Sequence, residues 1–578
     1  MGKKRGIDVN HREAGLLIPV FALKREGDFK IGDTDSFKDA IDFCARNGIK
    51  VLQTLPINET SGDNSPYNAI SSMALEPVLL SMQPDVVPGL SAADHALVKE
   101  EIAALDDEVI DYRSIKLLKQ KLLRKAYDAV LSDSGKKLQS AFERFKKERS
   151  AWLDPYALFR ALIELNGGSP VWPSWPEEQQ SFLAARKWVE SASNRKEIDR
   201  LEDFFKFVQW VADSQWQAVK AHADKMNVRL MGDVPFGVSR YSSDVWFEQA
   251  LFQLELSGGA PPEPVFAGDE FTKRWGQNWG IPLYHWEVHR KENFRWWRSR
   301  ITRLLEHFHD FRIDHVLGFF RVYAFPWTPD RNEEFLHLTD TEAMVHTDGI
   351  LPRFEPRDDE TADNRRLNKV EGYKVLSEIS DAAGDGCIVA EDLGLIVPPY
   401  VRPTIHELNM AGFAIPIFER DEETREFVPM EDLNPLSLAT YATHDHQPIR
   451  AYYEGLVKWW HSENGHEGWL EVQRLMRLLG RDEDSAPTEF TDEILFAFEK
   501  ALLQSPCWLA VMMITDLLGL GLRFNMPGKS GGECWTARLD RDLKSYEADE
   551  QFGSRIKAFR KLILETGRAQ EKVGAGSL

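Results

Sequence analysis

Cysteine is scarce in this sequence, and its few cysteines lie far apart. Only four occur among 578 residues, at Cys44, Cys387, Cys507 and Cys534. None of them forms a CxxC pair, so neither a disulfide framework nor a zinc site is predicted. Cys44, Cys387 and Cys507 stand in apolar segments, where a free thiol behaves as a small core residue. This pattern is typical of a reducing compartment, and we expect a cytoplasmic location.

Long apolar runs and an excess of positive charge are also missing. No apolar segment approaches the roughly 20 residues that a membrane-spanning helix needs. The basic N-terminus resembles a signal peptide only in outline, because polar residues separate it from the first apolar run. The formal net charge of −21 disfavours contact with nucleic acid or an anionic membrane and suits a neutral partner such as a sugar. The same charge could equally serve solubility alone.

No GxGxxG motif follows the first apolar run, which removes the main support for a nucleotide-binding sheet. The sequence instead contains eight short apolar runs that alternate with amphipathic helical patterns. Such runs are typical of strands buried in a parallel sheet, and eight is the number that closes a barrel. The runs are 15–23, 49–56, 227–236, 311–319, 387–395, 413–418, 438–445 and 508–520. We therefore predict an α/β fold of the (β/α)8 TIM-barrel class rather than a doubly wound open sheet.

The spacing of the runs predicts a large helical insertion after the second strand. About 170 residues separate the second run from the third, and they include long helical patterns such as 116–131. No low-complexity linker or internal repeat divides the chain. We expect a single catalytic barrel unit over 1–578, with a mainly helical insertion subdomain at 78–200 and further insertions in the barrel loops.

Charged side chains lie where the predicted strands end. In a TIM barrel, functional residues gather at the C-terminal ends of the strands. The stretch FRIDHVLGFF places Arg312 and Asp314 two residues apart, so both side chains would face the barrel interior. The other polar residues at strand ends are Asp233, Glu391, Asp392, His444, Asp445 and Asp516.

The convergence of carboxylates from separate strands at one barrel mouth favours a catalytic site. Taken singly, each acid could be a helix cap, as for Asp392 before LGL, or one half of a structural ion pair. Gathered together they repel, and a neighbouring arginine can keep one ionised while burial raises the pKa of another. A carboxylate beside a protonated carboxylic acid is what glycosidic bond chemistry requires.

A metal-dependent hydrolase is the rival interpretation. THDH at 443–446 and EHFHD at 306–310 offer histidine and carboxylate ligands. However, His307 and His309 precede their strand and so belong to the opposite end of the barrel, and a metal site needs three or four converging ligands. We expect no metal and no cofactor.

A series of segments along nearly the whole chain matches one known family in order. The segments are REAGLLIPVFAL, SPYNAISSMALEP, VWPSWP, GDVPFGVSRYSSDVWFE, GAPPE with WGQNWGIPLYHW, RIDHVLGFFR, VAEDLGLI, ATHD and LGLRFNMPG. With them the chain resembles the 4-α-glucanotransferases of the amylomaltase type, also called disproportionating enzymes, in glycoside hydrolase family seventy-seven. The sequence departs from the family's usual pattern at His446, where Asn is common, and in a longer loop at 264–275.

The resemblance implies a retaining mechanism with three carboxylates in separate roles. Asp314 would be the nucleophile, Glu391 the general acid and base, and Asp445 the carboxylate that binds the reacting sugar. Arg312 would keep Asp314 anionic, and Tyr67 would stack on the sugar. By the same matching, the residues around that sugar are Arg312, His315, His444, Asp233, Tyr67, Ser65, Asp392, Trp279 and Asn525.

The expected activity is transfer of maltooligosaccharyl or glucosyl units between α-1,4-glucans, in starch and glycogen metabolism. Maltooligosaccharides would be both donor and acceptor, with no nucleic acid or membrane partner. Two alternatives remain at this point. An α-1,4-glucan hydrolase could use the same scaffold, with water in place of the acceptor sugar, and a non-catalytic glucan-binding protein could share the cleft.

Overall fold

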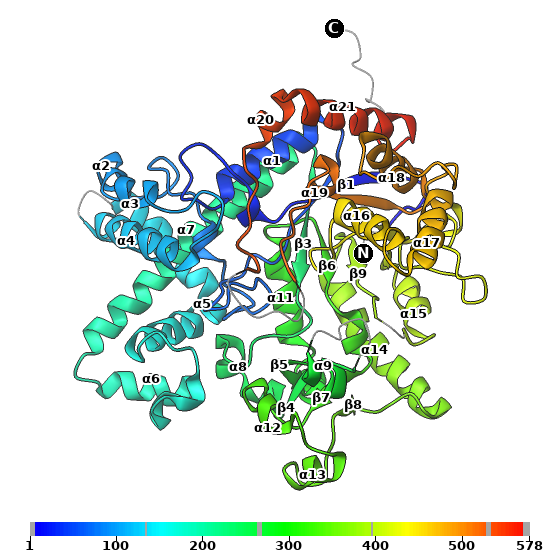
Figure 1. Cartoon of the computed structure of the whole chain (residues 1–578). Coiled ribbons are helices and arrows are strands. Elements are labelled where there is room, and N and C mark those ends of the chain that lie inside the picture. The colour runs from blue at the N-terminus through cyan, green and yellow to red at the C-terminus, as the bar shows by residue number, and fades with distance from the viewer. Residues whose placement is uncertain (1–5, 133–135, 263–268, 395–396, 527–532, 570–578) are drawn as a thin grey trace.

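Eight parallel strands form one sheet that closes into a barrel (Figure 1). The computed structural model describes residues 6–132, 136–262, 269–394, 397–526 and 533–569. Each strand overlaps one of the eight apolar runs. The strands are β1 (Glu13–Leu17), β2 (Val51–Gln53), β3 (Arg229–Val234), β6 (Asp310–Ile313), β9 (Ile388–Ala390), β10 (Gly412–Ala414), β11 (Ser437–Ala439) and β12 (Leu509–Met513).

The strand order shows how the barrel closes. Hydrogen-bonded neighbours follow the order β10-β11-β12-β1-β2-β3-β6-β9. The two end strands meet through the backbone of Ala411, whose carbonyl accepts from Ala390 N–H at 2.7 Å and whose N–H donates to the carbonyl of Ile388 at 3.0 Å. The predicted (β/α)8 barrel is therefore confirmed.

The barrel strands are short and buried on both faces, which is why they are apolar throughout rather than alternating. Amphipathic helices cover the outside of the barrel. They are α1 (Thr34–Arg46), α7 (Arg195–Met226), α11 (Arg295–Leu305), α14 (Ala362–Ala383), α15 (Val401–Glu407), α16 (Ile449–Trp460), α18 (Asp492–Gln504) and α21 (Glu550–Glu565). The first of them begins at a capping box, in which Asp33 accepts from the backbone N–H of Asp35 and Ser36.

Helices fill the long connection between β2 and β3 and lie on one side of the barrel (Figure 1). They are α2 (Ala92–Ala96), α3 (Lys99–Ala103), α4 (Tyr112–Leu131), α5 (Lys136–Leu165) and α6 (Phe182–Ser191). The last helix of this connection, α7, returns the chain to the barrel and packs against both α5 and α1. This connection occupies the place where the sequence predicts an insertion at 78–200.

A second, antiparallel sheet lies beside the barrel and was not predicted from the sequence. Its order is β5-β4-β7-β8, with β4 (Phe252–Ala260), β5 (Gln277–Tyr284), β7 (Val322–Phe325) and β8 (Arg353–Glu355). These strands come from the chain that follows β3 and β6, so they are insertions in barrel loops. Small helices accompany the sheet: α9 (Glu270–Trp275), α12 (Asn332–Phe335) and α13 (Asp340–Val345). Within the longer loop at 264–275, residues up to 268 lie outside the described part of the chain.

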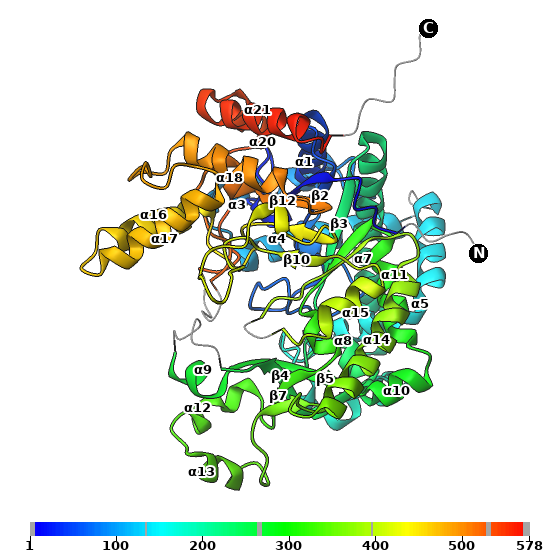
Figure 2. The ribbon, with the colours of Figure 1, turned by 90° about the vertical axis from the view of Figure 1, so that its right-hand side faces the viewer.

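The remaining helices connect or project from these layers. They are α8 (Ser243–Phe247), α10 (Trp286–Lys291), α17 (Gly465–Leu478), α19 (Ile514–Leu518) and α20 (Leu543–Ala548). Figure 2 shows α16 and α17 projecting from the barrel as a helical pair. All four cysteines are buried and none forms a disulfide, which agrees with the core thiols predicted at Cys44, Cys387 and Cys507. Across the described ranges, every helix is too short or too polar to cross a membrane.

Arg568 joins segments from the two ends of the chain at the N-terminal side of the barrel strands. Its guanidinium is fully buried and donates to four backbone carbonyls, those of Leu503 at 2.7 Å, Ser505 at 2.7 Å, Glu13 at 2.9 Å and Trp508 at 3.5 Å. Glu13 begins β1, while the other three carbonyls precede β12. One side chain therefore holds the start of two neighbouring strands together.

We predict that Arg568→Met lowers the stability of the fold strongly. The substitution removes a buried donor from these carbonyls, of which Ser505 keeps Arg12 and Trp508 keeps the Glu13 N–H. Each acceptor that is left unpaired costs about 1–3 kcal/mol. The measurement is urea unfolding followed by circular dichroism. The matched control is Arg560→Met on the exposed face of α21, which should change the unfolding free energy by less than about 0.5 kcal/mol. Equal effects of the two substitutions would contradict the role assigned to Arg568.

Candidate active site

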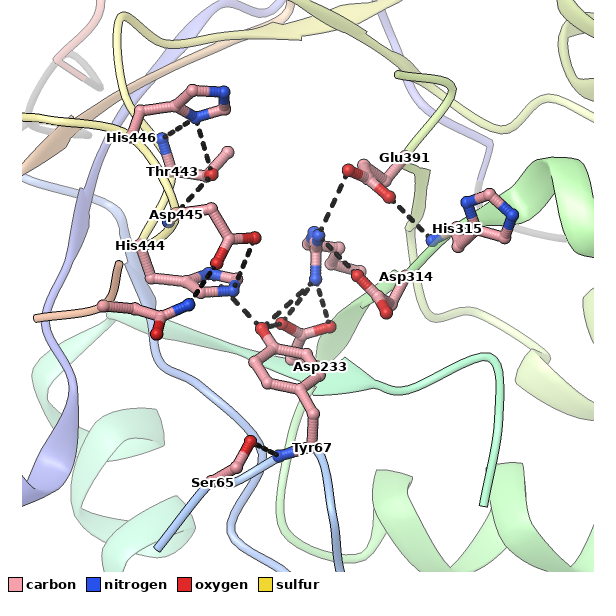
Figure 3. Close-up of polar contacts among 12 residues, drawn as sticks. Ser65, Tyr67, Asp233, Asp314, His315, Glu391, Thr443, His444, Asp445 and His446 are labelled. Carbon is pink, nitrogen blue, oxygen red and sulfur yellow. Dashed lines mark hydrogen bonds and ion pairs between the residues drawn. The ribbon is translucent and has the colours of Figure 1, made fainter. Parts of the chain in front are cut away.

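Arg312 is the cation of the polar cluster at the barrel mouth, since it contacts Asp233, Asp314 and Glu391. Figure 3 shows the three carboxyl groups around the same point. Arg312 belongs to β6, and the parallel register places it directly opposite Asp233 of β3. Its Nη1 donates to both oxygens of Asp233, at 2.9 and 2.7 Å. Its Nη2 donates to Asp314 at 2.8 Å and lies 3.5 Å from Glu391. One buried guanidinium thus contacts carboxylates from three neighbouring strands.

Asp314 is the first residue beyond β6, and its side chain is 28% exposed at the mouth. Its backbone N–H donates to the carbonyl of Val234 at 2.9 Å, which fixes the end of the strand. The next residue, His315, adopts a left-handed conformation with φ 44°, which is uncommon outside glycine. This turn aims the N–H of His315 at Glu391, to which it donates at 2.7 Å.

Glu391 follows β9 and is the more enclosed of the two carboxyl groups, with 16% of its side chain exposed. Burial raises its pKa to about 8, and the negative charges of Asp314 and Asp445 add to the effect. The charge of Arg312 and the hydrogen bond from His315 oppose this rise without cancelling it. At neutral pH the Glu391 side chain is therefore mainly a protonated carboxylic acid beside Asp314.

Asp445 lies in the loop that follows β11, and its side chain is 41% exposed. Its carboxylate contacts His444 Nε2 at 3.2 Å and accepts a hydrogen bond from Asn525 Nδ2 at 2.6 Å. Burial works to raise the pKa of Asp445, but His444 and Asn525 outweigh it and hold that pKa far below the usual range. Asp445 and Glu391 therefore carry opposite protonation states in the same cleft.

Tyr67 reaches the cluster from the loop after β2. Its hydroxyl donates to Asp233 at 2.7 Å, and its ring stacks on His444 with centroids 4.9 Å apart and planes at 20°. Ser65 holds the loop locally, because its Oγ accepts from the Tyr67 N–H at 3.3 Å. These contacts orient Tyr67 toward the carboxylates, and its contact with a sugar stays a prediction.

Trp279 is the aromatic side chain that the second sheet brings to this site. It lies on β5, is 38% exposed, and meets the ring of His315 edge to face with centroids 4.9 Å apart. Burial lowers the pKa of His315 to about 4, so its ring is neutral at neutral pH. The exposed indole offers the flat apolar face on which a pyranose ring can lie.

Asp392 does not join the cluster, although it is adjacent to Glu391 in the chain. Its side chain is buried and faces the other way, accepting from the N–H of Phe413 on β10 and from Arg402 on α15, both at 2.7 Å. It therefore links β9 to the next strand and helix instead of capping a helix. This geometry does not favour the expected contact of Asp392 with a sugar.

Two residues that sequence reasoning did not single out complete the surroundings of Asp445. Arg523 donates to the backbone carbonyl of Asp445 at 2.6 Å. Trp535 lies next to the stacked pair, with its ring 5.6 Å from His444 and 6.1 Å from Tyr67. The segment LGLRFNMPG contains Arg523 and could have pointed to it, whereas nothing near Trp535 distinguishes it from a packing residue.

The histidines of the two sequence segments considered as metal ligands make different contacts. Within the described ranges, the one metal-like group is Asp213 with Glu306 and His307. Arg303 already contacts both carboxylates of this group, so a cation is present there without a metal ion. At the barrel mouth, His446 of THDH turns its Nδ1 to Thr443 Oγ1, at 2.8 Å.

Comparison with known proteins gives a consistent assignment. A protein from Chlamydia pneumoniae named 4-alpha-glucanotransferase is 30% identical over 560 residues, covering 94% of each chain. One of the same name from Thermus thermophilus is 28% identical and covers 90% of this chain and 93% of its own. The structure of the amylomaltase from Streptococcus agalactiae in complex with acarbose has the same fold, with a TM-score of 0.74 at 22% identity and coverage of 97% of this chain and 100% of its own. The family model described as 4-alpha-glucanotransferase matches residues 18–544, and the chain therefore belongs to this family of glycoside hydrolases.

Proposed function

We propose that this protein is a 4-α-glucanotransferase of the amylomaltase type that transfers glucosyl or maltooligosaccharyl units between α-1,4-glucans. One observation carries the chemical part of this proposal. Arg312 contacts Asp314 at 2.8 Å while Glu391, 3.5 Å from the same nitrogen, has its pKa raised to about 8 by burial. A carboxyl group in contact with a cation, beside a protonated carboxylic acid, is the arrangement that retaining glycosidic chemistry uses.

In the first step, a carboxylate oxygen of Asp314 would form a bond to the anomeric carbon of the donor sugar. The glycosidic bond breaks, and the Glu391 proton passes to the leaving oxygen, so that the released glucan ends in a hydroxyl. Retaining enzymes keep these two carboxyl groups about 5–5.5 Å apart. The shared contact with one nitrogen of Arg312 is consistent with that spacing.

In the second step, Glu391 would act as a base because it has just lost its proton. It takes the proton from a hydroxyl of the acceptor glucan, whose oxygen attacks the anomeric carbon and breaks the ester bond to Asp314. Both groups return to their starting states. A hydrolase would differ only in admitting water at this step, and family membership favours transfer.

The ionised Asp445 would bind hydroxyl groups of the sugar that reacts, since its carboxylate is exposed and held by His444 and Asn525. Charge-assisted hydrogen bonds of this kind are about twice as strong as neutral ones. Tyr67, His444 and Asp233 would surround the same sugar, and Trp279 would contact it or its neighbour through the exposed indole face.

Maltotriose should be converted into a ladder of longer maltooligosaccharides together with glucose. Such a ladder requires that a sugar hydroxyl, rather than water, intercepts the intermediate. Product analysis by anion-exchange chromatography gives the distribution, and treatment with EDTA beforehand should leave it unchanged. The appearance of shorter products alone would contradict transfer.

Glu391→Gln should lower the rate on maltotriose by about 10²–10⁴-fold, the usual contribution of a general acid. With α-maltosyl fluoride the loss should be much smaller for the first step, because fluoride leaves without a proton. The glycosyl group should then accumulate on the peptide that contains Asp314, detected by mass spectrometry, and Asp314→Asn should abolish the adduct. Glu422→Gln, at an exposed position, is the matched control and should keep the native rate on maltotriose. An adduct on a residue other than Asp314 would rule out Asp314 as the nucleophile.

The pH dependence of kcat/KM should follow the protonation of Glu391. The acid form is the active one, so activity is retained up to the raised pKa and falls as pH increases through about 8. Initial rates with maltotriose between pH 3 and 10 give this limb. The limb should disappear when Glu391→Gln acts on the fluoride donor. A fall in kcat/KM centred near the ordinary glutamate pKa of about 4.3 would show that burial does not raise the pKa of Glu391.

A further inference from the structure

Asp445 is held at each of its polar groups. Its backbone N–H donates to Thr443 Oγ1 at 3.3 Å, and its carbonyl accepts from Arg523 Nη2 at 2.6 Å. One carboxylate oxygen contacts His444 Nε2 at 3.2 Å, and the other accepts from Asn525 Nδ2 at 2.6 Å. Thr443 and His444 are neighbours of Asp445 in the chain, so their contacts stay within one loop. Arg523 and Asn525 come from the loop beyond α19 and connect Asp445 to a different part of the barrel mouth.

Arg523 makes two contacts that together close a ring. Besides donating to the carbonyl of Asp445, its guanidinium donates through Nε to the carbonyl of Asn525, at 2.6 Å. The side chain of Asn525 then returns to the carboxylate of Asp445. Three short hydrogen bonds therefore join these three residues, and two of the bonds cross between the loop after β11 and the loop beyond α19. Bonds from a charged donor are stronger than neutral ones, and the planar guanidinium fixes the directions of both acceptors.

The ring matters because the carboxylate of Asp445 is 41% exposed. A single hydrogen bond from Asn525 to an exposed carboxylate competes with water and contributes little by itself. Arg523 is half-buried and binds the backbones of both partners, so it sets the distance between them before their side chains meet. Such placement affects catalysis strongly, since a displacement of about 1 Å can cost about 10²-fold in rate.

We propose that Arg523 is a positioning residue, which holds the Asp445 carboxylate and the Asn525 amide in the arrangement that binds the reacting sugar. The inference rests on the proposed function, because Asp445 is assigned to that sugar there. Arg523 acts through the backbones of its two partners and not through contact with the substrate. Figure 3 shows Asp445 and Glu391 on opposite sides of the cluster, so sugar binding can weaken while the proton donor keeps its surroundings.

Arg523→Met should lower kcat/KM by about 10–100-fold. The factor should be the same for maltotriose and for α-maltosyl fluoride, because both donors place the same kind of sugar beside Asp445. This separates Arg523 from Glu391, whose substitution should spare the fluoride. The fall in kcat/KM through about pH 8, which reports the pKa of Glu391, should also keep its position. A loss confined to maltotriose, or a shifted fall, would show that Arg523 acts on Glu391 and would overturn the proposal.

Arg450→Met is the matched control. Arg450 is also partly exposed and donates to the backbone carbonyl of Gly519 at 3.3 Å, at the start of the loop beyond α19. Its substitution removes an arginine from this loop without removing a contact to Asp445 or Asn525. It should therefore leave kcat/KM near the native value, and a loss equal to that of Arg523→Met would contradict a specific role for Arg523.

A double-mutant cycle with Asn525→Ala tests whether Arg523 acts through its partner. Residues that work through the same contact are not additive. The variant with both substitutions should therefore lose clearly less than the product of the two single losses. A loss equal to that product would mean that the two residues act independently, and it would overturn the proposal.

Crystal structures of the native protein and of Arg523→Met test the geometry without any substrate. We expect Asn525 Nδ2 to leave hydrogen-bonding distance of Asp445 Oδ1 in the variant, and an unchanged contact would overturn the positioning role. If the native protein is inactive on both donors, the proposed function fails, and this comparison still decides the role of Arg523. Arg523→Lys replaces it if Arg523→Met does not fold, because one ammonium takes the place of the planar pair of donors, and the same displacement is expected.

Discussion

The active site depends on the guanidinium of Arg312, which contacts Asp233, Asp314 and Glu391 at once. Without a cation at this point, three carboxyl groups from neighbouring strands would repel one another at the top of the barrel. With it, Asp233 is fixed on one side while Asp314 stays available to the cleft on the other. The position is set by the parallel register, because pairing of β3 with β6 places Asp233 opposite Arg312. The chemistry proposed for Asp314 and Glu391 rests on this register.

The same cleft holds acids of opposite character, and their surroundings explain the difference. Glu391 is enclosed and receives one backbone hydrogen bond, so burial dominates and its pKa rises. Asp445 is more exposed and is held by His444 and Asn525, which lower its pKa even though burial works in the other direction. The two carboxyl groups therefore differ in protonation before any substrate binds. The proposed general acid and the proposed sugar-binding carboxylate thus have the protonation states they need at one pH.

The barrel positions the carboxyl groups, and inserted segments supply much of what surrounds them. Tyr67 comes from the loop after β2, Trp279 from the antiparallel sheet, and Asn525 from the loop beyond α19. These segments are tied to the strand ends by contacts to Asp233, His315 and Asp445 respectively. Such a division, with a rigid sheet beneath and variable loops above, is the general way in which this fold carries different activities. Asp392 belongs to the rigid part beneath the loops, where its carboxylate accepts hydrogen bonds from Arg402 and from the N–H of Phe413.

The sequence by itself determined the barrel and the identity of the central residues. Eight apolar runs buried on both faces predict eight parallel strands, and charged residues such as Arg312, Asp314 and Glu391 can lie at their ends only if they meet at one mouth. Only the tertiary structure decided what depends on contacts between distant segments. It turned Asp392 away from the cleft, built the second sheet that presents Trp279, and placed Arg523 beside Asp445 and Trp535 beside His444. The physical reason is that strand periodicity is a local property of the chain, whereas side-chain direction, burial and charge balance are fixed by neighbours far away in sequence.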